Sequence, residues 1–246
     1  MISVRDLTRN YGDFTAVRRI SFTVNPGEVL GLVGPNGAGK TTTLRCLAGI
    51  IAPSVGSVEI AGHDIQKAPV AAKQALAFIP DEPHLIAHLT VEEHLRFLGR
   101  RYGVADVEQR MTPLLDELEI AEKRKALSTE LSRGMKQKLA IACGLIHDPS
   151  VLILDEPLTG LDPGGMRRMR ATIANRARAG ASVVLSSHLL TLVEELCTKL
   201  FVIRRGECVA CGTLEEIVSG HPELAGMSLE DVFLALTGTD ERVATA

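Results

Sequence analysis

A glycine-rich segment near the start of the chain has the residue types and the spacing needed to bind phosphate groups. It reads Gly34-Pro35-Asn36-Gly37-Ala38-Gly39-Lys40-Thr41. This sequence fits the pattern G-x-x-x-x-G-K-[ST], in which glycines let successive backbone N–H groups converge on phosphate oxygens. In this pattern Lys40 reaches the β- and γ-phosphates, and the hydroxyl of Thr41 binds Mg²⁺. An ordinary glycine-rich turn before a helix is the structural alternative.

The residues on both sides of this segment favour the phosphate-binding interpretation. Residues 27–33 form an apolar run that begins after Pro26 and predicts a buried strand. Residues 42–48, which begin with Thr42, predict the start of a helix, and a helix N-terminus favours bound anions. A strand, a glycine loop and a helix in this order predict that the chain binds a nucleoside triphosphate.

Two adjacent carboxylates, Asp155 and Glu156, follow a second apolar run at residues 151–154. Ligands of open α/β sheets gather at the C-terminal ends of the strands, so we expect this pair near the phosphates. Asp155 fits the acidic residue that holds Mg²⁺ beside a phosphate loop, and Glu156 is suited to activate or orient the attacking water. An acidic pair is more often a solvated turn, but the phosphate-binding segment upstream favours the catalytic interpretation.

An aromatic residue, Tyr11, lies shortly before the phosphate-binding segment in a chain with no Trp and only two Tyr. Its ring is suited to stack on the adenine face of a nucleotide. A loop aromatic that covers the end of a sheet explains the residue equally well. The residue type and its position leave both interpretations open.

The composition is that of an ordinary globular protein. The 246 residues are 46% hydrophobic and 23% charged, and their net charge of −3 gives no indication of a surface for nucleic acid or anionic membranes. No apolar run approaches the roughly 18 residues that cross a bilayer, and no signal peptide opens the chain, so we expect that the chain does not enter the membrane. The five cysteines predict reduced thiols, and the C-x-x-C at Cys208 and Cys211 stands without a second pair.

Apolar and alternating runs predict the strands of the core. They lie at residues 2–7, 16–24, 57–60, 75–80, 151–154, 182–186 and 200–211, the last as a hairpin. A basic amphipathic helix is expected at residues 166–179. Tyr11 falls in the loop between the first two strands, and residues 62–64 are expected to form a turn.

Helical character predominates between residues 85 and 150. Thr90 to Glu93 form a capping box, and Ser132 is the expected N-cap of a helix at 133–146. We therefore predict a helical lobe at about 85–150, inserted into an α/β core that spans residues 1–220. Residues 221–246 are expected to form a helical appendage with Ser228 as N-cap and a loose polar tail from Thr237.

Further motifs, taken in order, make the chain resemble the ATP-binding cassette (ABC) ATPases over nearly its whole length. The matching positions are Tyr11, the loop Gly34–Thr41, a segment at 78–83, Leu131-Ser132-Arg133-Gly134-Met135, Leu154-Asp155-Glu156-Pro157, Gly160-Leu161-Asp162 and His188. The resemblance implies an α/β fold with a P-loop NTPase (RecA-like) core, an antiparallel β subdomain and an inserted helical subdomain. It also implies ATP and Mg²⁺ as cofactors and ATP hydrolysis as the reaction.

Four residues acquire a role only through this resemblance. Ser132 and Gly134 belong to the family's signature loop, which closes over the γ-phosphate held by the second subunit of a head-to-tail dimer. A helix N-terminus at Ser132 is physically suited to an anion. Asp162 matches the loop that communicates across the dimer, and His188 matches the switch histidine that contacts the γ-phosphate.

The chain departs from the family pattern at two places. Asp81 stands where the family usually has a glutamine near Mg²⁺, so we expect Asp81 to bind the cation and to add a negative charge. The signature contains Arg133 and Met135 in place of the commonest glycine and glutamine. Glu156 and His188 are both present, and we therefore expect an active ATPase.

The resemblance further suggests the separate ATPase subunit of a transporter. Residues 82–89, just after Asp81, are expected to dock on the cytoplasmic coupling helix of a membrane permease, and residues 229–238 resemble the bacterial export and drug-efflux subset. The partners implied are this permease and a second ATPase subunit, in a homodimer or a heterodimer, on the cytoplasmic face of the cell membrane, without nucleic acid. An ABC ATPase of a soluble assembly, or a regulatory cassette that binds ATP without hydrolysing it, remains an alternative.

Overall fold

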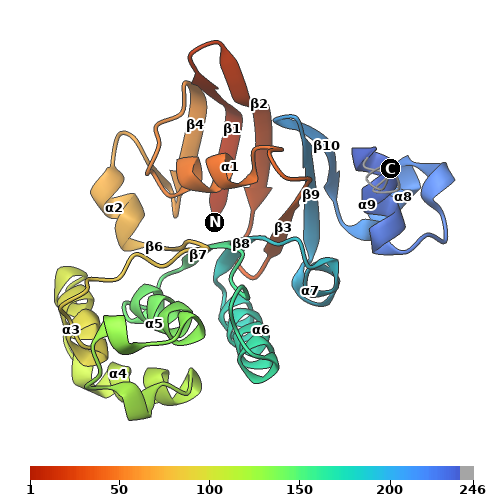
Figure 1. The fold of residues 1–246 in the computed structure, drawn as a ribbon. Coiled ribbons are helices and arrows are strands. Elements are labelled where there is room, and N and C mark those ends of the chain that lie inside the picture. The colour runs from red at the N-terminus through yellow and green to blue at the C-terminus, as the bar shows by residue number, and fades with distance from the viewer. Residues whose placement is uncertain (239–246) are drawn as a thin grey trace.

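A mixed six-stranded sheet forms the centre of the computed structural model, which describes residues 1–238 (Figure 1). Its strand order is β10-β9-β3-β8-β7-β6. All neighbours are parallel except β9 and β10, which form an antiparallel hairpin. The strands are β3 (Val29–Val33), β6 (Leu76–Ile79), β7 (Val151–Asp155), β8 (Ser182–Ser186), β9 (Lys199–Arg204) and β10 (Glu207–Gly212).

A second, antiparallel sheet has the strand order β2-β1-β4-β5. Its strands are β1 (Ile2–Tyr11), β2 (Phe14–Val24), β4 (Val55–Ile60) and β5 (His63–Asp64). Tyr11 is therefore the last residue of β1, paired with Phe14 across a tight hairpin, and not part of a longer loop. The turn expected at residues 62–64 is also partly strand, because β5 pairs with the end of β4.

Helix α1 (Lys40–Leu47) packs on strands of both sheets, and Leu44, Cys46 and Leu47 of the helix belong to the apolar cluster between them. Alternate residues of the central strands explain the continuous apolar runs in the sequence. Leu30 and Leu32 of β3 face the cluster that contains α1, whereas Val29 and Val33 face the cluster on the other side of the sheet. A parallel sheet covered on both faces needs apolar side chains in both directions.

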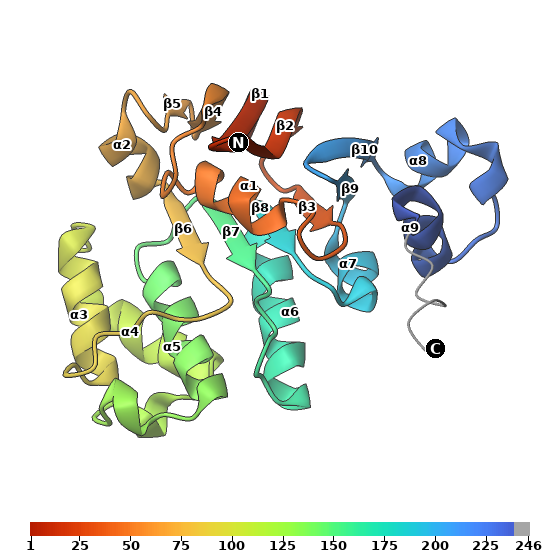
Figure 2. The ribbon, with the colours of Figure 1, turned by 45° about the horizontal axis from the view of Figure 1, so that its top comes forward.

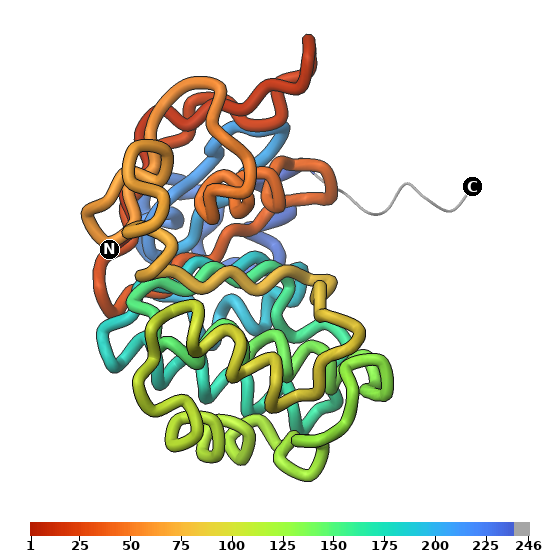
Figure 3. Tube along the Cα trace, turned by 90° about the vertical axis from the view of Figure 1, so that its left-hand side faces the viewer, coloured from red at the N-terminus to blue at the C-terminus, as the bar shows by residue number. Residues whose placement is uncertain are grey.

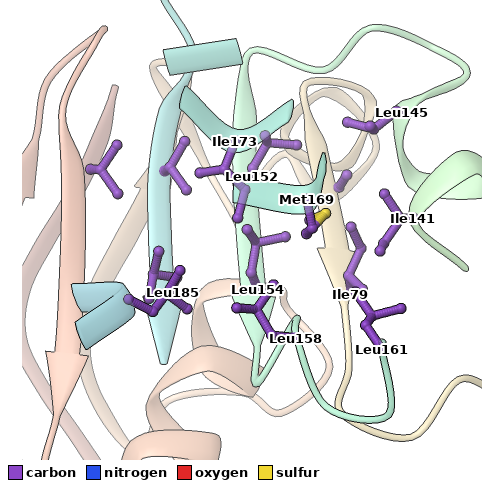
Figure 4. Close-up of a cluster of buried hydrophobic side chains, with 14 of the residues drawn as sticks. Ile79, Ile141, Leu145, Leu152, Leu154, Leu158, Leu161, Met169, Ile173 and Leu185 are labelled. Carbon is purple, nitrogen blue, oxygen red and sulfur yellow. The ribbon is translucent and has the colours of Figure 1, made fainter. Parts of the chain in front are cut away.

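The cluster on the other face of the sheet is covered by helices (Figure 4). Leu152 and Leu154 of β7 lie beside Met169 and Ile173 of α6 (Pro163–Arg178). Helices α7 (Leu190–Leu196) and α9 (Leu229–Thr237) add further apolar residues to the same cluster. The central sheet is thus buried on both sides, and its strand ends are left free to carry polar residues.

Residues 80–90, directly after β6, form no helix, and helices make up most of the remaining segment up to β7 (Figure 3). They are α3 (Val91–Arg101), α4 (Val107–Glu117), α5 (Arg133–Leu145) and the short 3₁₀ helices η1 (Ala121–Lys123) and η2 (Ser128–Glu130). Helix α3 begins with the expected capping box, in which Glu93 N donates to Thr90 Oγ1 at 3.3 Å and Thr90 N donates to Glu93 Oε2 at 2.8 Å. Within residues 1–238 no helix is long and apolar enough to cross a membrane.

Charged side chains join three of these elements. Arg96 of α3 contacts Glu92 at 3.0 Å and Glu108 of α4 at 2.5 Å. Arg124, which follows η1, contacts the same two glutamates at 2.7 Å each. We call these four residues the charge network. Each arginine therefore bridges α3 and α4.

Three short helices were not expected from the sequence: α2 (Pro69–Gln74), α7 and α8 (Leu214–Gly220). Thr237 was expected to open a loose tail, but it belongs to α9, where its Oγ1 donates to Phe233 O at 2.7 Å. Gly238, with a φ of 61°, then ends the helix in the left-handed conformation that favours glycine. The remainder of the predicted tail, residues 239–246, lies outside the described residues.

Candidate nucleotide site

Four neighbouring parallel strands deliver their C-terminal ends to one edge of the central sheet (Figure 2). The phosphate-binding segment follows β3, Asp81 follows β6, Asp155 ends β7 and His188 follows β8. A cavity of about 600 Å³ opens at this edge. It is lined by Tyr11, Phe14, Ala16, Asn36, Gly37, Gly39, Lys40, Thr41, Thr42, Asp81, Asp155, Glu156, Thr159 and His188.

The cavity brings together most of the predicted site residues, and it contains three that were not predicted. Phe14 and Ala16 enter from β2, and Thr159 enters from the loop after β7. The two-residue turn Gly12-Asp13 between Tyr11 and Phe14 is a hairpin signal that could have indicated Phe14. No sequence pattern indicated Ala16 or Thr159.

The phosphate-binding loop owes its shape to glycines in positions that other residues tolerate poorly. Gly39 has a φ of 108°, and a Cβ there would lie 2.6 Å from the carbonyl oxygen of Ala16. A Cβ at Gly34 would collide with the carbonyl oxygen of Ile203. Gly34, Pro35 and Ala38 do not line the cavity. Ala38 is buried, and its carbonyl oxygen accepts a hydrogen bond from Gly206 N at 2.8 Å.

The ammonium group of Lys40 lies inside the curve of this loop. Its Nζ donates to Gly34 O at 2.6 Å and to Pro35 O at 3.1 Å. Burial lowers the pKa of Lys40, and the negative charges of Glu156 and Asp155 partly oppose that effect. The cation is therefore held by neutral carbonyls, which phosphate oxygens can replace as stronger partners.

Glu156 and His188 are hydrogen-bonded to each other. Glu156 Oε2 accepts from His188 Nδ1 at 2.8 Å, and from Ser187 Oγ and His188 N at 3.4 Å each. The backbone of Glu156 has a φ of 49°, which for a residue other than glycine costs on the order of 1–3 kcal/mol. Such strain persists where the surrounding structure fixes it. Here Glu156 N donates to Ser186 O at 3.1 Å.

The cavity also contains oxygen atoms of the kind that bind a hard cation. Asp155 is 5% exposed, and its Oδ1 accepts from Ser186 Oγ at 2.6 Å. Oδ1 of Asp81 is buried and has no hydrogen-bond partner within residues 1–238. A buried carboxylate oxygen without a partner is costly, and a bound cation would supply that partner. Together with the hydroxyl of Thr41, these residues fit Mg²⁺, which prefers oxygen ligands.

No group of three or more His, Cys, Asp and Glu side chains in the described part of the chain is arranged to hold a metal. A Mg²⁺ ion in this cavity therefore requires Thr41 and oxygens of a bound ligand in addition to the carboxylates. The cysteines of the C-x-x-C, Cys208 and Cys211, are exposed free thiols on β10, remote in sequence from the cavity residues.

Ser132, Gly134 and Asp162 do not line the cavity. Ser132 is the N-cap of α5, and its Oγ accepts from Met135 N at 3.3 Å. Asp162 is the N-cap of α6, and its Oδ1 accepts from Gly165 N at 3.2 Å. The segments that carry these two caps are in close contact. A Cβ added at Gly134 would lie only 2.6 Å from Gly160 O. The signature segment and residues 160–162 thus form a surface separate from the cavity.

Comparison with known proteins agrees with this geometry. The sequence profile of the family described as "ABC transporter" matches residues 17–159. The chain is 36% identical over 245 residues to the ABC-type transporter ATP-binding protein EcsA of Bacillus subtilis (strain 168), covering 98% of each chain. It is 38% identical over 215 residues to the Nod factor export ATP-binding protein I of Paraburkholderia xenovorans (strain LB400), covering 87% of this chain and 71% of that protein.

A solved structure of an ATP-binding subunit of an ABC transporter has the same fold. Its TM-score is 0.92 at 33% identity, and the match covers 96% of this chain and 99% of that one. The predicted fold class, a P-loop NTPase core with an antiparallel sheet and helical elements, is therefore confirmed. The chain belongs to the ABC transporter family and is one of its ATPase cassettes.

Proposed function

We propose that this chain binds ATP and Mg²⁺ in the cavity and hydrolyses the ATP to drive export through a separate membrane permease. The observation that carries this proposal is the composition of the cavity. Lys40, Thr41, Asp155, Glu156 and His188 arrive from three neighbouring strands and meet in one space of about 600 Å³. These side chains bring an ammonium group, a hydroxyl, two carboxylates and an imidazole to one site, which are groups suited to phosphoryl transfer.

In the proposed complex the triphosphate lies on the loop Gly34–Thr41, with Lys40 and Thr42 beside its oxygens. The adenine stacks on Tyr11, which lines the cavity on the side of β1. Thr41, Asp81 and Asp155 hold Mg²⁺, which when bound neutralises phosphate charge. The phosphate oxygens replace the carbonyls of Gly34 and Pro35 as partners of Lys40.

Glu156 is the proposed base that orients the attacking water and accepts its proton. The hydrogen bonds from His188 Nδ1 and from Ser187 Oγ hold the carboxylate in position before that water binds. Base catalysis of this kind contributes typically about 10²–10⁴ in rate. Asp155 is restrained by Ser186 instead, so the two adjacent carboxylates serve different partners.

The signature residues support a head-to-tail pair of cassettes. Ser132 and Gly134 lie outside the cavity of their own chain, so they do not reach its phosphates. The N-terminus of α5 at Ser132 offers a partial positive charge to the γ-phosphate bound by another copy. Asp162, next to the signature segment, would then lie at the same interface.

A second cavity, of about 340 Å³, supports docking of a membrane permease. It is lined in part by Pro83, Leu85 and Ile86 and by Phe97 of α3. Phe97 is 53% exposed and Ile86 is 46% exposed, and neighbouring apolar side chains at a surface groove suit the apolar face of a helix. Residues 82–89 are thus the proposed contact with a permease, on the cytoplasmic face of the cell membrane. Relatives named for export, such as the Nod factor protein, favour the outward direction.

Replacing Glu156 tests the hydrolytic mechanism. Glu156→Gln keeps the size and the acceptor oxygen but removes the base, so turnover falls by about 10²–10⁴ while ATP still binds. The variant then accumulates as an ATP-bound dimer, measured by light scattering after size-exclusion chromatography. Glu195→Gln, on the exposed end of α7, is the matched control and retains wild-type turnover. Equal hydrolysis by wild type and Glu156→Gln contradicts the assignment.

Purification from native membranes tests the proposed partner. The expected result is a multi-span protein that co-purifies in stoichiometric amount and raises the ATPase rate. A soluble partner in its place favours an ABC ATPase of a soluble assembly. ATP-driven dimerisation without hydrolysis favours a regulatory cassette.

A further inference from the structure

The aromatic ring at the mouth of the nucleotide cavity has a cationic partner. Cζ of Arg9 lies over the ring of Tyr11, 4.6 Å from its centroid. A guanidinium at this distance is attracted to the negative face of the ring. Tyr11 nevertheless remains 44% exposed and lines the cavity, so ring surface is available to a base while Arg9 covers the other part.

The same guanidinium is anchored to the segment that follows the phosphate-binding helix. Nη1 of Arg9 donates to Ala52 O at 2.9 Å. Two further bonds join β1 to this segment, because Asn10 N donates to Ser54 Oγ at 3.0 Å and Ser54 N donates to Thr8 O at 2.8 Å. Arg9 thus contacts the ring on one side and, through Ala52, the chain that leaves α1 on the other.

From this arrangement we propose that Arg9 is a positioning residue for the nucleotide base. It holds the ring of Tyr11 at a fixed place relative to α1, whose first residues line the phosphate end of the cavity. The inference rests on the proposed function, since it assigns the base of ATP to the ring of Tyr11. It predicts a three-layer stack of guanidinium, phenol and adenine, in which Arg9 acts on the nucleotide only through Tyr11.

A purely structural role for Arg9 is the competing explanation, since the residue also ties the β1–β2 hairpin to residues 52–54. The two explanations predict different effects of an Arg9 substitution on the binding of ATP and of inorganic tripolyphosphate, which lacks the base. If Arg9 positions the base, its substitution weakens the binding of ATP and leaves the binding of tripolyphosphate unchanged. If Arg9 is needed only for the local fold, its substitution also displaces the phosphate-binding loop and weakens the binding of both ligands.

The experiment is calorimetric titration with ATP and with tripolyphosphate, without Mg²⁺ so that no turnover occurs. Arg9→Gln is expected to raise the Kd for ATP two- to fivefold, about 0.5–1 kcal/mol at 1.4 kcal/mol per tenfold, which is the range of an exposed cation–π contact. The Kd for tripolyphosphate stays within error of wild type. Arg9→Lys, which keeps a cation over the ring, recovers part of the ATP affinity. Arg5→Gln removes the same charge from an exposed position of the same strand and serves as the matched control.

Substitution of the ring completes the test. Tyr11→Ala is expected to weaken the binding of ATP but not of tripolyphosphate. Adding Arg9→Gln to Tyr11→Ala causes no further loss of ATP affinity, because Arg9 acts through the ring. The proposal is overturned if Arg9→Gln leaves ATP affinity unchanged while Tyr11→Ala weakens it. It is overturned equally if Arg9→Gln weakens tripolyphosphate as much as ATP, or if its effect persists without the ring. Failure of the wild-type protein to bind ATP when Mg²⁺ is also supplied refutes the proposed function itself.

Discussion

At the scale of single residues, Asp81 distinguishes this cavity from the pattern of its family. A carboxylate stands where a neutral amide is usual, and one of its oxygens is buried without a partner within residues 1–238. Asp155 and Glu156 line the same space, so three carboxylates face the place where the phosphates are proposed to lie. Without a cation these carboxylates repel phosphates, and Asp81 and Asp155 are the two that are proposed to bind the cation.

Asp81→Asn therefore has opposite expected effects on ATP binding with and without Mg²⁺. The amide removes one negative charge but keeps an oxygen of nearly the same reach. One unit charge at a solvated site corresponds to about 1 kcal/mol, or about fivefold in Kd. Without Mg²⁺ the variant binds ATP more tightly than wild type, and with Mg²⁺ it binds ATP less tightly.

Fluorescence titration with a labelled ATP analogue, with and without Mg²⁺, measures both effects. Glu82→Gln changes a neighbouring charge that does not line the cavity and is the matched control. An unchanged ratio of the two Kd values in Asp81→Asn contradicts the assignment of Asp81 as a cation ligand.

The residues of the site were predictable where chemistry and chain order coincide. Lys40, Thr41, Asp155 and Glu156 occur in short local patterns, and each pattern is tied to the end of a strand. Thr159 belongs to no such pattern, because the fold of the loop after β7 brings it to the cavity. Ala16 reaches the cavity from β2, and a contact of that kind between distant segments leaves no periodic or local signal in a single sequence.

At the scale of elements, the N-cap of α5 has two separable roles. Ser132 Oγ accepts from Met135 N and so stabilises the helix, and the same helix end is the proposed contact to the γ-phosphate of another copy. Aspartate caps helices as well as serine does, but it carries a negative charge. The two residues therefore share the structural role and differ in the functional one.

Ser132→Asp is expected to preserve stability and abolish ATP-driven dimerisation. Its free energy of unfolding in urea stays within about 0.5 kcal/mol of wild type, whereas Ser132→Ala loses about 1 kcal/mol. In the Glu156→Gln background Ser132→Asp prevents the ATP-bound dimer, because two negative charges would meet. Thr213→Asp makes the same exchange at the N-cap of α8 and leaves dimerisation unchanged. A stable dimer of Ser132→Asp with ATP refutes the phosphate contact.

The elements that were missed are short. Helices α2 and α8 have six and seven residues, too few for a helical period to emerge from the apolar pattern. By contrast, the capping box at Thr90 and the N-caps at Ser132 and Ser228 were predictable, because each uses a side chain that bonds a nearby backbone N–H. Tyr11 was assigned to a loop because the sheet extends further than the alternation of residues 2–7 indicates.

At the scale of the whole molecule, the cavity exists only when distant parts of the chain are folded together. Tyr11 and His188 line the same space although most of the chain separates them. A ligand that needs this cavity binds the folded state alone, so it raises the free energy of unfolding by mass action. The shift is about 2.7 kcal/mol at a concentration of 100 times Kd, and each kcal/mol raises Tm by roughly 2–4 °C for a chain of this size.

ADP at that concentration is therefore expected to raise Tm by roughly 5–10 °C in a calorimetric scan. Lys40→Met removes the half-buried cation of the phosphate-binding loop and abolishes the shift. Lys67→Met makes the same exchange at an exposed position and retains it. If Lys40→Met responds to ADP as wild type does, the nucleotide binds elsewhere.

The charge network joins α3 and α4 and stiffens the helical segment between β6 and β7. A single exposed ion pair breaks easily, but each arginine here holds two glutamates, so α3 cannot slide along α4 without losing two contacts at once. A partner bound at Phe97, as proposed, is therefore expected to move α3 and α4 together. The segment leaves β6 on the side of Asp81, which lines the cavity, and it rejoins the sheet at Val151, the end of β7 opposite to Asp155. High salt screens these ion pairs, so α3 and α4 are expected to move more independently of each other. The proposed coupling between ATP hydrolysis and a membrane partner would then weaken at a salt concentration at which the cassette itself is still folded.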